Sequence, residues 1–123
     1  MSATGEFEID MAPQTDVGAP AGRMVLNKTY RGGMQGSGVG QMISKRIENG
    51  VAVYYAIEEF TGSVEGRSGA FTLIHQGRMN EEGSSLEVTI LEGSGSGDLA
   101  TISGSMTIDQ DASGHSYELR YEL

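Results

Sequence analysis

The chain has 123 residues, 17 of them acidic and 8 basic, and its formal net charge of -9 argues against nucleic acid or anionic membranes as partners. It contains no cysteine, which excludes disulfides and thiolate chemistry. Its length suits one domain over residues 1–123. The first residues lack the pattern of a signal peptide and no segment has the length and hydrophobicity of a membrane span, so we expect a cytoplasmic protein.

Apolar and polar residues alternate along most of the chain, which is typical of half-buried β-strands. Connections rich in glycine, such as "RGGM", "ENGV" and "EGSGSGD", separate the alternating segments. The segment "QMISKRIENG" has weak helical character, but its Asn49–Gly50 pair favours a tight turn. In chain order, the predicted strands cover residues 4–11, 22–31, 34–47, 51–64, 69–80, 84–92, 99–109 and 115–123.

Strands of this number, joined in sequence, can pair the last strand with the first. Closure removes the free edges that otherwise promote aggregation. The sequence therefore predicts an all-β protein, a closed eight-stranded antiparallel up-and-down β-barrel. A sandwich of two sheets is the alternative.

The tight turns predict which residues face each other on neighbouring strands. A two-residue turn at Asn49–Gly50 places Gln41 opposite Glu58. A two-residue turn at Gly66–Arg67 places Glu58 opposite His75. These three polar residues form a predicted row across three strands, with the side chains of opposite pairs close enough to interact.

The same counting through the "GG" and "EE" turns places Ser37 opposite Lys28 and Val88 opposite His75. One face then runs through all strands and must be the interior, because the opposite face is largely charged or hydroxylated. The predicted interior comprises Phe7, Ile9, Met11, Met24, Leu26, Lys28, Tyr30, Ser37, Val39, Gln41, Ile43, Tyr54, Ala56, Glu58, Phe60, Phe71, Leu73, His75, Leu86, Val88, Ile90, Ile102, Met106, Ile108, His115, Tyr117, Leu119 and Tyr121.

The second to fifth strands depart from this pattern because apolar residues also occupy their predicted outer face. A contiguous exposed apolar patch usually marks an interface, so we expect a homo-oligomer. The alternative is that the loop over residues 12–21 covers the patch. The predicted patch comprises Val25, Met42, Val53, Tyr55, Ile57 and Ile74.

Polar residues in a barrel interior need partners, because burying an unpaired charge is costly. Glu58 and His75 are the candidate catalytic residues, an acid–base pair in which the carboxylate orients the imidazole. Lys28 would supply a positive charge for a carboxylate or an enolate. The candidate ligand-binding residues are Lys28, Gln41, Tyr54, Phe60, Phe71, Tyr117 and Tyr121.

These residues favour a protein that binds a small hydrophobic molecule, with cyclase or isomerase activity as the extension of that function. The alternative is a non-catalytic structural or binding protein in which Gln41, Glu58 and His75 only satisfy one another. An open pocket that reaches Glu58 or His75 favours the first, and a row sealed by aromatic side chains favours the second. Two histidines and one glutamate are too few for a metal site, so neither a metal nor a cofactor is expected.

Five segments, "TGEFEI", "LNKTYRGGMQGSG", "EEFTGSVEGRSGAFTLIHQG", "LEGSGSGDLATISGSM" and "GHSYELRYEL", resemble the bacterial family known as domain of unknown function 3224. That family is similar in architecture to allene oxide cyclase, whose plant members cyclise an epoxide derived from a fatty acid. The resemblance implies a closed eight-stranded barrel and no established activity. Lys28, Glu58 and His75 fall within the matching segments, whereas Glu59 stands where the family often has a basic residue.

Overall fold

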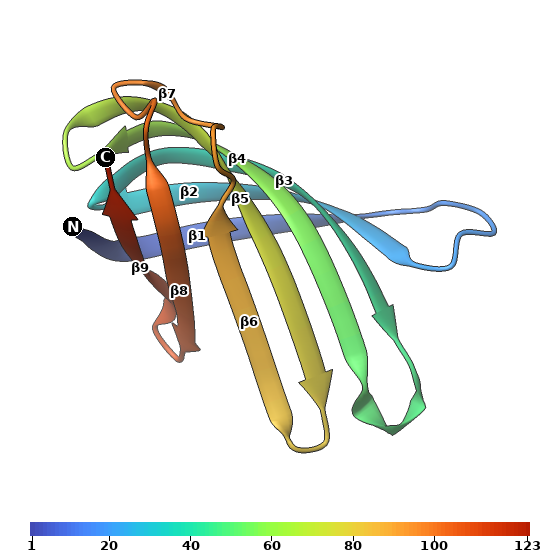
Figure 1. Ribbon diagram of the computed structural model, residues 1–123. Helices are drawn as coiled ribbons and strands as arrows, with labels where there is room; N and C mark the ends of the chain where they lie inside the picture. Colours follow the sequence, from blue (N-terminus) through green and yellow to red (C-terminus); the bar gives the residue numbers. More distant parts are fainter.

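The computed structural model describes all 123 residues and consists almost entirely of β-strands (Figure 1). Its one helical element, the 3₁₀ turn η1, spans Glu48–Gly50, and no helix is long and apolar enough to cross a membrane. The strands are β1 (Ser2–Gln14), β2 (Gly22–Gly32), β3 (Met34–Arg46), β4 (Ala52–Val64), β5 (Arg67–Asn80), β6 (Gly83–Ile90), β7 (Ser96–Gly97), β8 (Ser103–Asp111) and β9 (Gly114–Glu122).

The sheet closes on itself, as predicted. Each strand from β1 to β5 pairs antiparallel with the next, β6 pairs with β8, β8 with β9, and β9 returns to β1. The two-residue β7 adds to the edge of β5, where Gly97 lies opposite Gly69. The structure is therefore a closed eight-stranded antiparallel barrel with one short extra strand.

The strand predicted over residues 99–109 begins only at Ser103. The preceding residues form turns, in which the Leu99 N–H bonds to the Ser96 carbonyl and the Ile102 N–H bonds to the Leu99 carbonyl. Leu99 and Ile102 are nevertheless buried in the core. This loop therefore closes one end of the barrel with apolar side chains.

The predicted register is wrong for β3. Arg46 pairs with Ala52, so the connection after β3 is five residues long and the Ile47 N–H bonds to the Val51 carbonyl across it. Gly40, rather than Gln41, consequently lies opposite Glu58. A one-residue change of register moves every side chain of a strand to the opposite face.

The pairing of β2 with β3 is also shifted by one residue from the prediction. The chain reverses around Gly33, whose N–H bonds to the Thr4 carbonyl, and Gly38 rather than Ser37 lies opposite Lys28. Four residues predicted to be interior therefore point outward, namely Ser37, Val39, Gln41 and Ile43. The inward positions of β3 are occupied by Met34, Gly36, Gly38, Gly40, Met42 and Ser44.

The β4–β5 turn is displaced by one residue from its prediction. Glu65 and Gly66 form the turn with φ values of 48° and 85°, as in hairpin turns that need two residues with positive φ. His75 consequently lies opposite Ala56, and Leu73 lies opposite Glu58. The pairing moves by two residues, which is the period of a strand, so Glu58 and His75 still point inward as predicted. The pairing of His75 with Val88 across β5 and β6 is confirmed.

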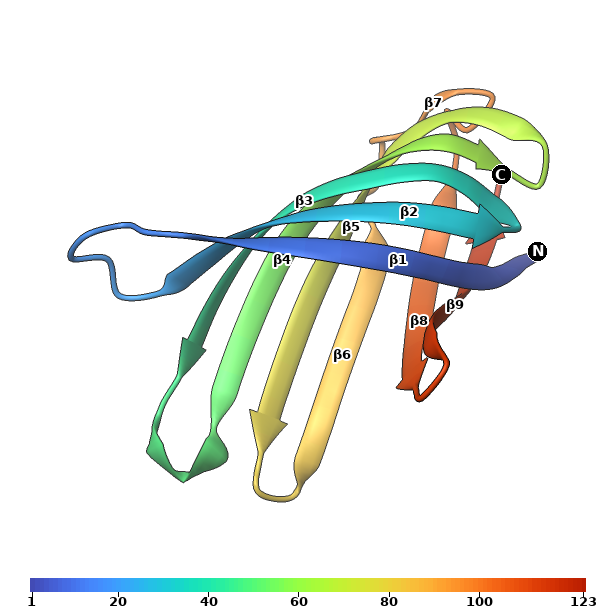
Figure 2. The same ribbon diagram turned by 180° about the vertical axis from the view of Figure 1, so that it is seen from behind.

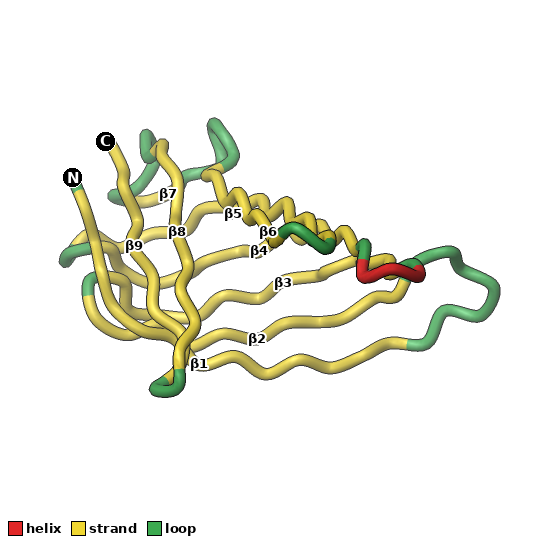
Figure 3. The backbone as a smooth tube through the Cα atoms, turned by 90° about the horizontal axis from the view of Figure 1, so that it is seen from below, coloured by secondary structure: helices red, strands yellow, loops and turns green.

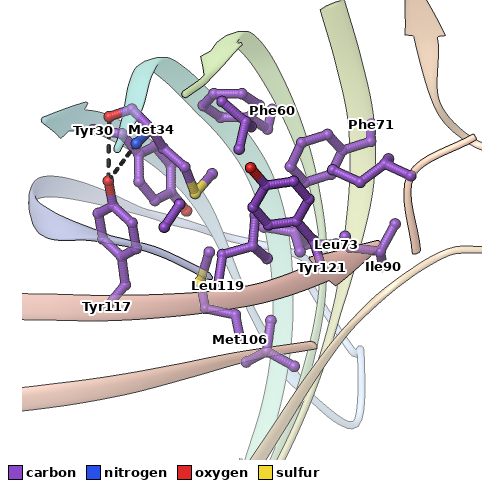
Figure 4. Close-up of a cluster of buried hydrophobic side chains, with 14 of the residues drawn as sticks. Tyr30, Met34, Phe60, Phe71, Leu73, Ile90, Met106, Tyr117, Leu119 and Tyr121 are labelled. Carbon is purple, nitrogen blue, oxygen red and sulfur yellow. Dashed lines mark hydrogen bonds between the residues drawn. The ribbon is translucent and has the colours of Figure 1, made fainter. Parts of the chain in front are cut away.

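The interior of the barrel has a packed half and a hollow half. A cluster of 16 buried apolar residues fills the half near the β4–β5 turn and the β7 loop, where Phe60, Phe71 and Leu73 have no exposed surface (Figure 4). In the other half, aliphatic side chains and methionines together with polar and aromatic residues surround a cavity.

The wall of the hollow half is incomplete between β6 and β8. Only Val88 with Met106 and Thr89 with Ser105 are paired there, and beyond them the two strands separate (Figures 1 and 2). The view from below shows the curved wall formed by β1 to β5, with the shorter β8–β9 hairpin beside it (Figure 3). Leu86 on β6 and Ile108 on β8 line the cavity at this opening.

We predict that Gly38→Ala destabilises the protein by about 1–3 kcal/mol, the usual cost of overpacking a core. A Cβ at this position would overlap Glu58 Oε2 and lie 3.0 Å from the Tyr30 ring. The measurement is the free energy of unfolding in urea. Gly22→Ala is the matched control, because a Cβ there would have its nearest neighbour at 3.7 Å; equal losses in both variants would contradict the prediction.

Candidate functional site

Glu58 is the centre of a buried polar cluster at the boundary between the two halves of the barrel. Its side chain has no exposed surface and accepts three hydrogen bonds. Lys28 Nζ lies 2.9 Å and His75 Nε2 lies 2.8 Å from Glu58 Oε1. The Tyr30 hydroxyl donates to Oε2 at 2.5 Å. Strands β2, β4 and β5 thus each contribute to one cluster.

The glycines of β3 make this cluster possible. Lys28 and Tyr30 lie on β2 and Glu58 lies on β4, two strand spacings or about 9.6 Å away along the sheet. Between them, β3 presents Gly38 and Gly40 inward, with no side chain to separate the two strands. The side chains of β2 therefore reach across β3 to the carboxylate.

Burial by itself raises the pKa of Glu58, but the hydrogen bond from His75, the charge of Lys28 and the hydrogen bond from Tyr30 outweigh that effect and lower the pKa to about 2. The same burial, together with the adjacent Glu58 carboxylate, raises the pKa of Tyr30. Glu58 is thus an anion and Tyr30 a neutral donor at neutral pH. Lys28 also lies over the face of Phe7, 4.7 Å from the ring centroid, in a cation–π contact.

A cavity of about 610 Å³ occupies the hollow half and ends on this cluster. Lys28 and His75 line its floor, whereas Glu58 does not reach its surface. A volume of this size suits a small organic ligand. The remaining lining residues are Phe7, Ile9, Met11, Met24, Leu26, Met42, Ser44, Lys45, Arg46, Ala52, Tyr54, Ala56, Met79, Ser84, Leu86, Ile108, Gln110 and His115.

The hydrogen bond between His75 and Glu58 determines the tautomer of the imidazole. Glu58 is ionised and can only accept, so Nε2 of a neutral His75 carries the proton and Nδ1 carries the free lone pair. Nδ1 of His75 has no hydrogen-bond partner within the protein. Every fully buried side-chain nitrogen and oxygen has such a partner, so Nδ1 is not fully buried. Since His75 lines the cavity, Nδ1 is accessible there.

The family model described as "Protein of unknown function (DUF3224)" matches residues 3–121. The chain belongs to the DUF3224 family. It is similar to a protein of unknown function from this family in Shewanella oneidensis MR-1, whose crystal structure superposes with a TM-score of 0.93. The two sequences are 32% identical, and the alignment covers 100% of this chain and 96% of the other. No curated protein matches the chain.

The polar residues of this DUF3224 barrel lie partly where they were predicted. Glu58 and His75 are in contact, although they are diagonal neighbours instead of an opposite pair. Lys28 joins them. Gln41 does not, because the register of β3 turns it to the exposed outer face.

The aromatic candidates divide between the two halves of the barrel. Tyr54 lines the cavity, where burial raises the pKa of its hydroxyl. Phe60, Phe71, Tyr117 and Tyr121, predicted to bind a ligand, instead belong to the packed core (Figure 4).

The hydroxyls of Tyr117 and Tyr121 form hydrogen bonds within the protein. Tyr117 donates to the Arg31 carbonyl at 2.8 Å and accepts from the Met34 N–H at 2.8 Å, and Tyr121 donates to Glu65. These bonds join β9 to the reversal at Gly33 and to the β4–β5 turn at the packed end of the barrel.

Two further groups at this site were missed from the sequence. Tyr30 was expected inside but was given no part in the site, and Met42 was placed on the outer face although it lines the cavity. The signal for both was the run "GSGVG" over residues 36–40. Glycine at alternate positions of a strand marks a face on which neighbouring side chains need room. No group of three or more His, Cys, Asp or Glu side chains suited to a metal ion comes together in the structure.

We predict that Glu58 contributes stability that depends on pH in the acid range. Its pKa is about 2 in the folded state against 4.5 for a free side chain, so its contribution is complete above pH 4.5 and is lost as the pH falls towards 2. The shift corresponds to on the order of 3 kcal/mol. The difference in free energy of unfolding between wild type and Glu58→Gln should therefore shrink over this range. Glu87→Gln, at an exposed position, is the control; a difference that stays constant from pH 6 to 2.5 would refute the prediction.

Proposed function

We propose that this protein binds a small, largely hydrophobic molecule in the barrel cavity and catalyses a proton transfer on it, as in an isomerisation or a cyclisation. The observation that carries the proposal is the meeting of an apolar cavity of about 610 Å³ with Lys28 and His75. A cluster that served only to stabilise the core would account for the buried Glu58. It would not account for an open cavity that ends on two of its partners.

The geometry supports different roles for the members of the cluster. His75 presents Nδ1 to the cavity and is the candidate base. Lys28 uses one N–H on Glu58 and retains further donors for a ligand oxygen. Glu58 is enclosed by its partners, so it acts as a positioning residue that orients the imidazole of His75 and the ammonium group of Lys28. This assignment replaces a direct catalytic role for Glu58.

The chemistry that fits these roles is proton transfer next to a carbonyl group. Nδ1 of His75 takes a proton from a carbon adjacent to the carbonyl, and the electrons of the broken C–H bond form an enolate on the ligand oxygen. Lys28 donates a hydrogen bond to that oxygen and stabilises its negative charge. The imidazolium then returns the proton to another carbon, so that atoms and charges balance without a further reactant.

We expect filling of the cavity to weaken ligand binding. Ala56 is buried, lines the cavity and lies opposite His75, so the added ring of Ala56→Phe occupies the ligand space. The probe is the fluorescent dye 8-anilinonaphthalene-1-sulfonate, whose emission rises in apolar sites. Wild type should bind it, and Ala56→Phe should bind at least tenfold more weakly.

Thr61→Phe is the matched control for this experiment, because it adds the same ring on the exposed outer face of the same strand. Circular dichroism establishes that each variant is folded. Dye binding that is absent in wild type, or equal in wild type and Ala56→Phe, would refute the cavity as a binding site.

The catalytic proposal is tested with a panel of small β,γ-unsaturated ketones, whose conversion to the conjugated isomers is followed by ultraviolet absorbance. We expect His75→Asn to lower the rate by about 10²–10⁴, the usual contribution of a general base. The control is Gln76→Asn, on the exposed outer face of β5 beside His75, which should leave the rate unchanged. Rates equal to those without protein across the panel, while the dye still binds, would leave ligand binding supported and reject proton transfer.

A further inference from the structure

The outer face of β2 to β5 carries a contiguous group of apolar side chains. With the register of the structure, Ile43 lies beside Tyr55, and Ile57 lies beside Ile74. Val39 and Ile43 replace Met42 in the patch predicted from the sequence. Val39, Ile43, Tyr55 and Ile57 are exposed to 51%, 50%, 41% and 58%. We call them, with the half-buried Val25, Val53 and Ile74, the outer apolar patch.

The loop between β1 and β2 does not cover this patch. It is tied to the edge of the face, where Asp16 pairs with Arg23 at 2.7 Å and the Pro20 carbonyl accepts from Lys45 at 3.3 Å. With the loop in this position, Ile43 and Ile57 are still exposed to 50% and 58%. Intramolecular covering of the patch, the alternative considered for the sequence, is therefore wrong.

The size of the patch suits an interface between proteins. Four neighbouring strands lie about 4.8 Å apart, and the patch extends over about six residues along them at about 3.4 Å each. Its footprint, with the exposed Gln41 between Val25 and Ile57, is on the order of 300–400 Å², the size of the largest apolar patch on a typical protein, which is often functional.

The charges on this face indicate a second copy of the same chain. Arg23 and Arg31 are already paired with Asp16 and Glu8. The remaining charges are Lys45 and Arg78 at one end of the patch and Glu59 at the other. Elsewhere the chain is strongly acidic, with a net charge of -9, so two copies repel each other through most of their other faces.

We propose that the outer apolar patch is the interface of a two-fold symmetric homodimer. The strands of the two copies run in opposite directions across the interface, which brings the Glu59 end of one copy to the Arg78 end of the other. An isologous contact of this kind forms the pair of Glu59 with Arg78 twice, once for each copy, and is closed at two copies. The interface lies on the outside of the wall and leaves the cavity free, so the proposal is independent of the function proposed above.

Sedimentation equilibrium on the full chain tests the dimer. We expect wild type to have twice the mass of the 13.0 kDa chain at micromolar concentration. Ile57→Glu and Ile43→Glu should each raise the dissociation constant at least tenfold, because they place a carboxylate in the centre of the interface. Thr107→Glu, on the exposed face of β8, introduces the same charge elsewhere and should leave the mass unchanged.

Charge reversal tests the orientation of the two copies. Glu59→Arg should weaken the dimer at least tenfold, and the double variant Glu59→Arg with Arg78→Glu should recover most of the lost affinity. A wild-type mass of 13.0 kDa up to 200 µM, a mass of three copies, or a dimer unaffected by Ile57→Glu would each overturn the proposal. Failure of the double variant to restore the affinity lost in Glu59→Arg would overturn the antiparallel arrangement.

Discussion

A carboxylate without access to water, Glu58, constrains the centre of this barrel. Removing its charge from solvent is costly unless donors surround it, and the structure provides Lys28, Tyr30 and His75. Two of these donors come from a strand that is not adjacent to β4. They reach the carboxylate only because Gly38 and Gly40 leave the intervening strand without inward side chains. The burial of one charge thus determines the composition of β3 and the alignment of three other strands.

The same cluster separates two regions of different packing. On one side, large aromatic residues and the loop that carries Leu99 form a core of buried apolar side chains. On the other side, the β8–β9 hairpin is short and β6 diverges from β8, so the wall is open and aliphatic residues and methionines line a cavity. The core packs against one side of the cluster, and on the other side the largely buried Lys28 and His75 line the cavity. Packed support beside a cavity is the arrangement on which the proposed function depends.

The comparison of β3 with its neighbours explains the errors in the predicted site. The inward direction of Glu58 and His75 was predicted correctly because their strands are joined by a tight hairpin. Its turn lies one residue from the predicted position, which shifts the pairing by two residues and keeps the same faces inward. Around β3 the errors were single residues, at the reversal near Gly33 and at the η1 turn. These moved Gln41 to the surface and Met42 to the cavity. Assigning Gly36, Gly38 and Gly40 to the interior would have corrected the register. The side chains of Lys28, Tyr30 and Glu58 occupy the space that inward side chains of β3 would otherwise fill.

By itself, the sequence determined the class of fold, the number of barrel strands and the membership of most interior positions. Alternation with period two and glycine-rich turns are local properties, and local properties suffice for these. The tertiary structure decided which polar residues meet, which half of the barrel is hollow and which apolar residues stay exposed outside. Those outcomes depend on the exact geometry of the turns and on contacts between strands distant in the chain, as between Lys28 and Glu58. A shift of one residue, invisible in the pattern of hydrophobicity, exchanges the inside of a strand for its outside.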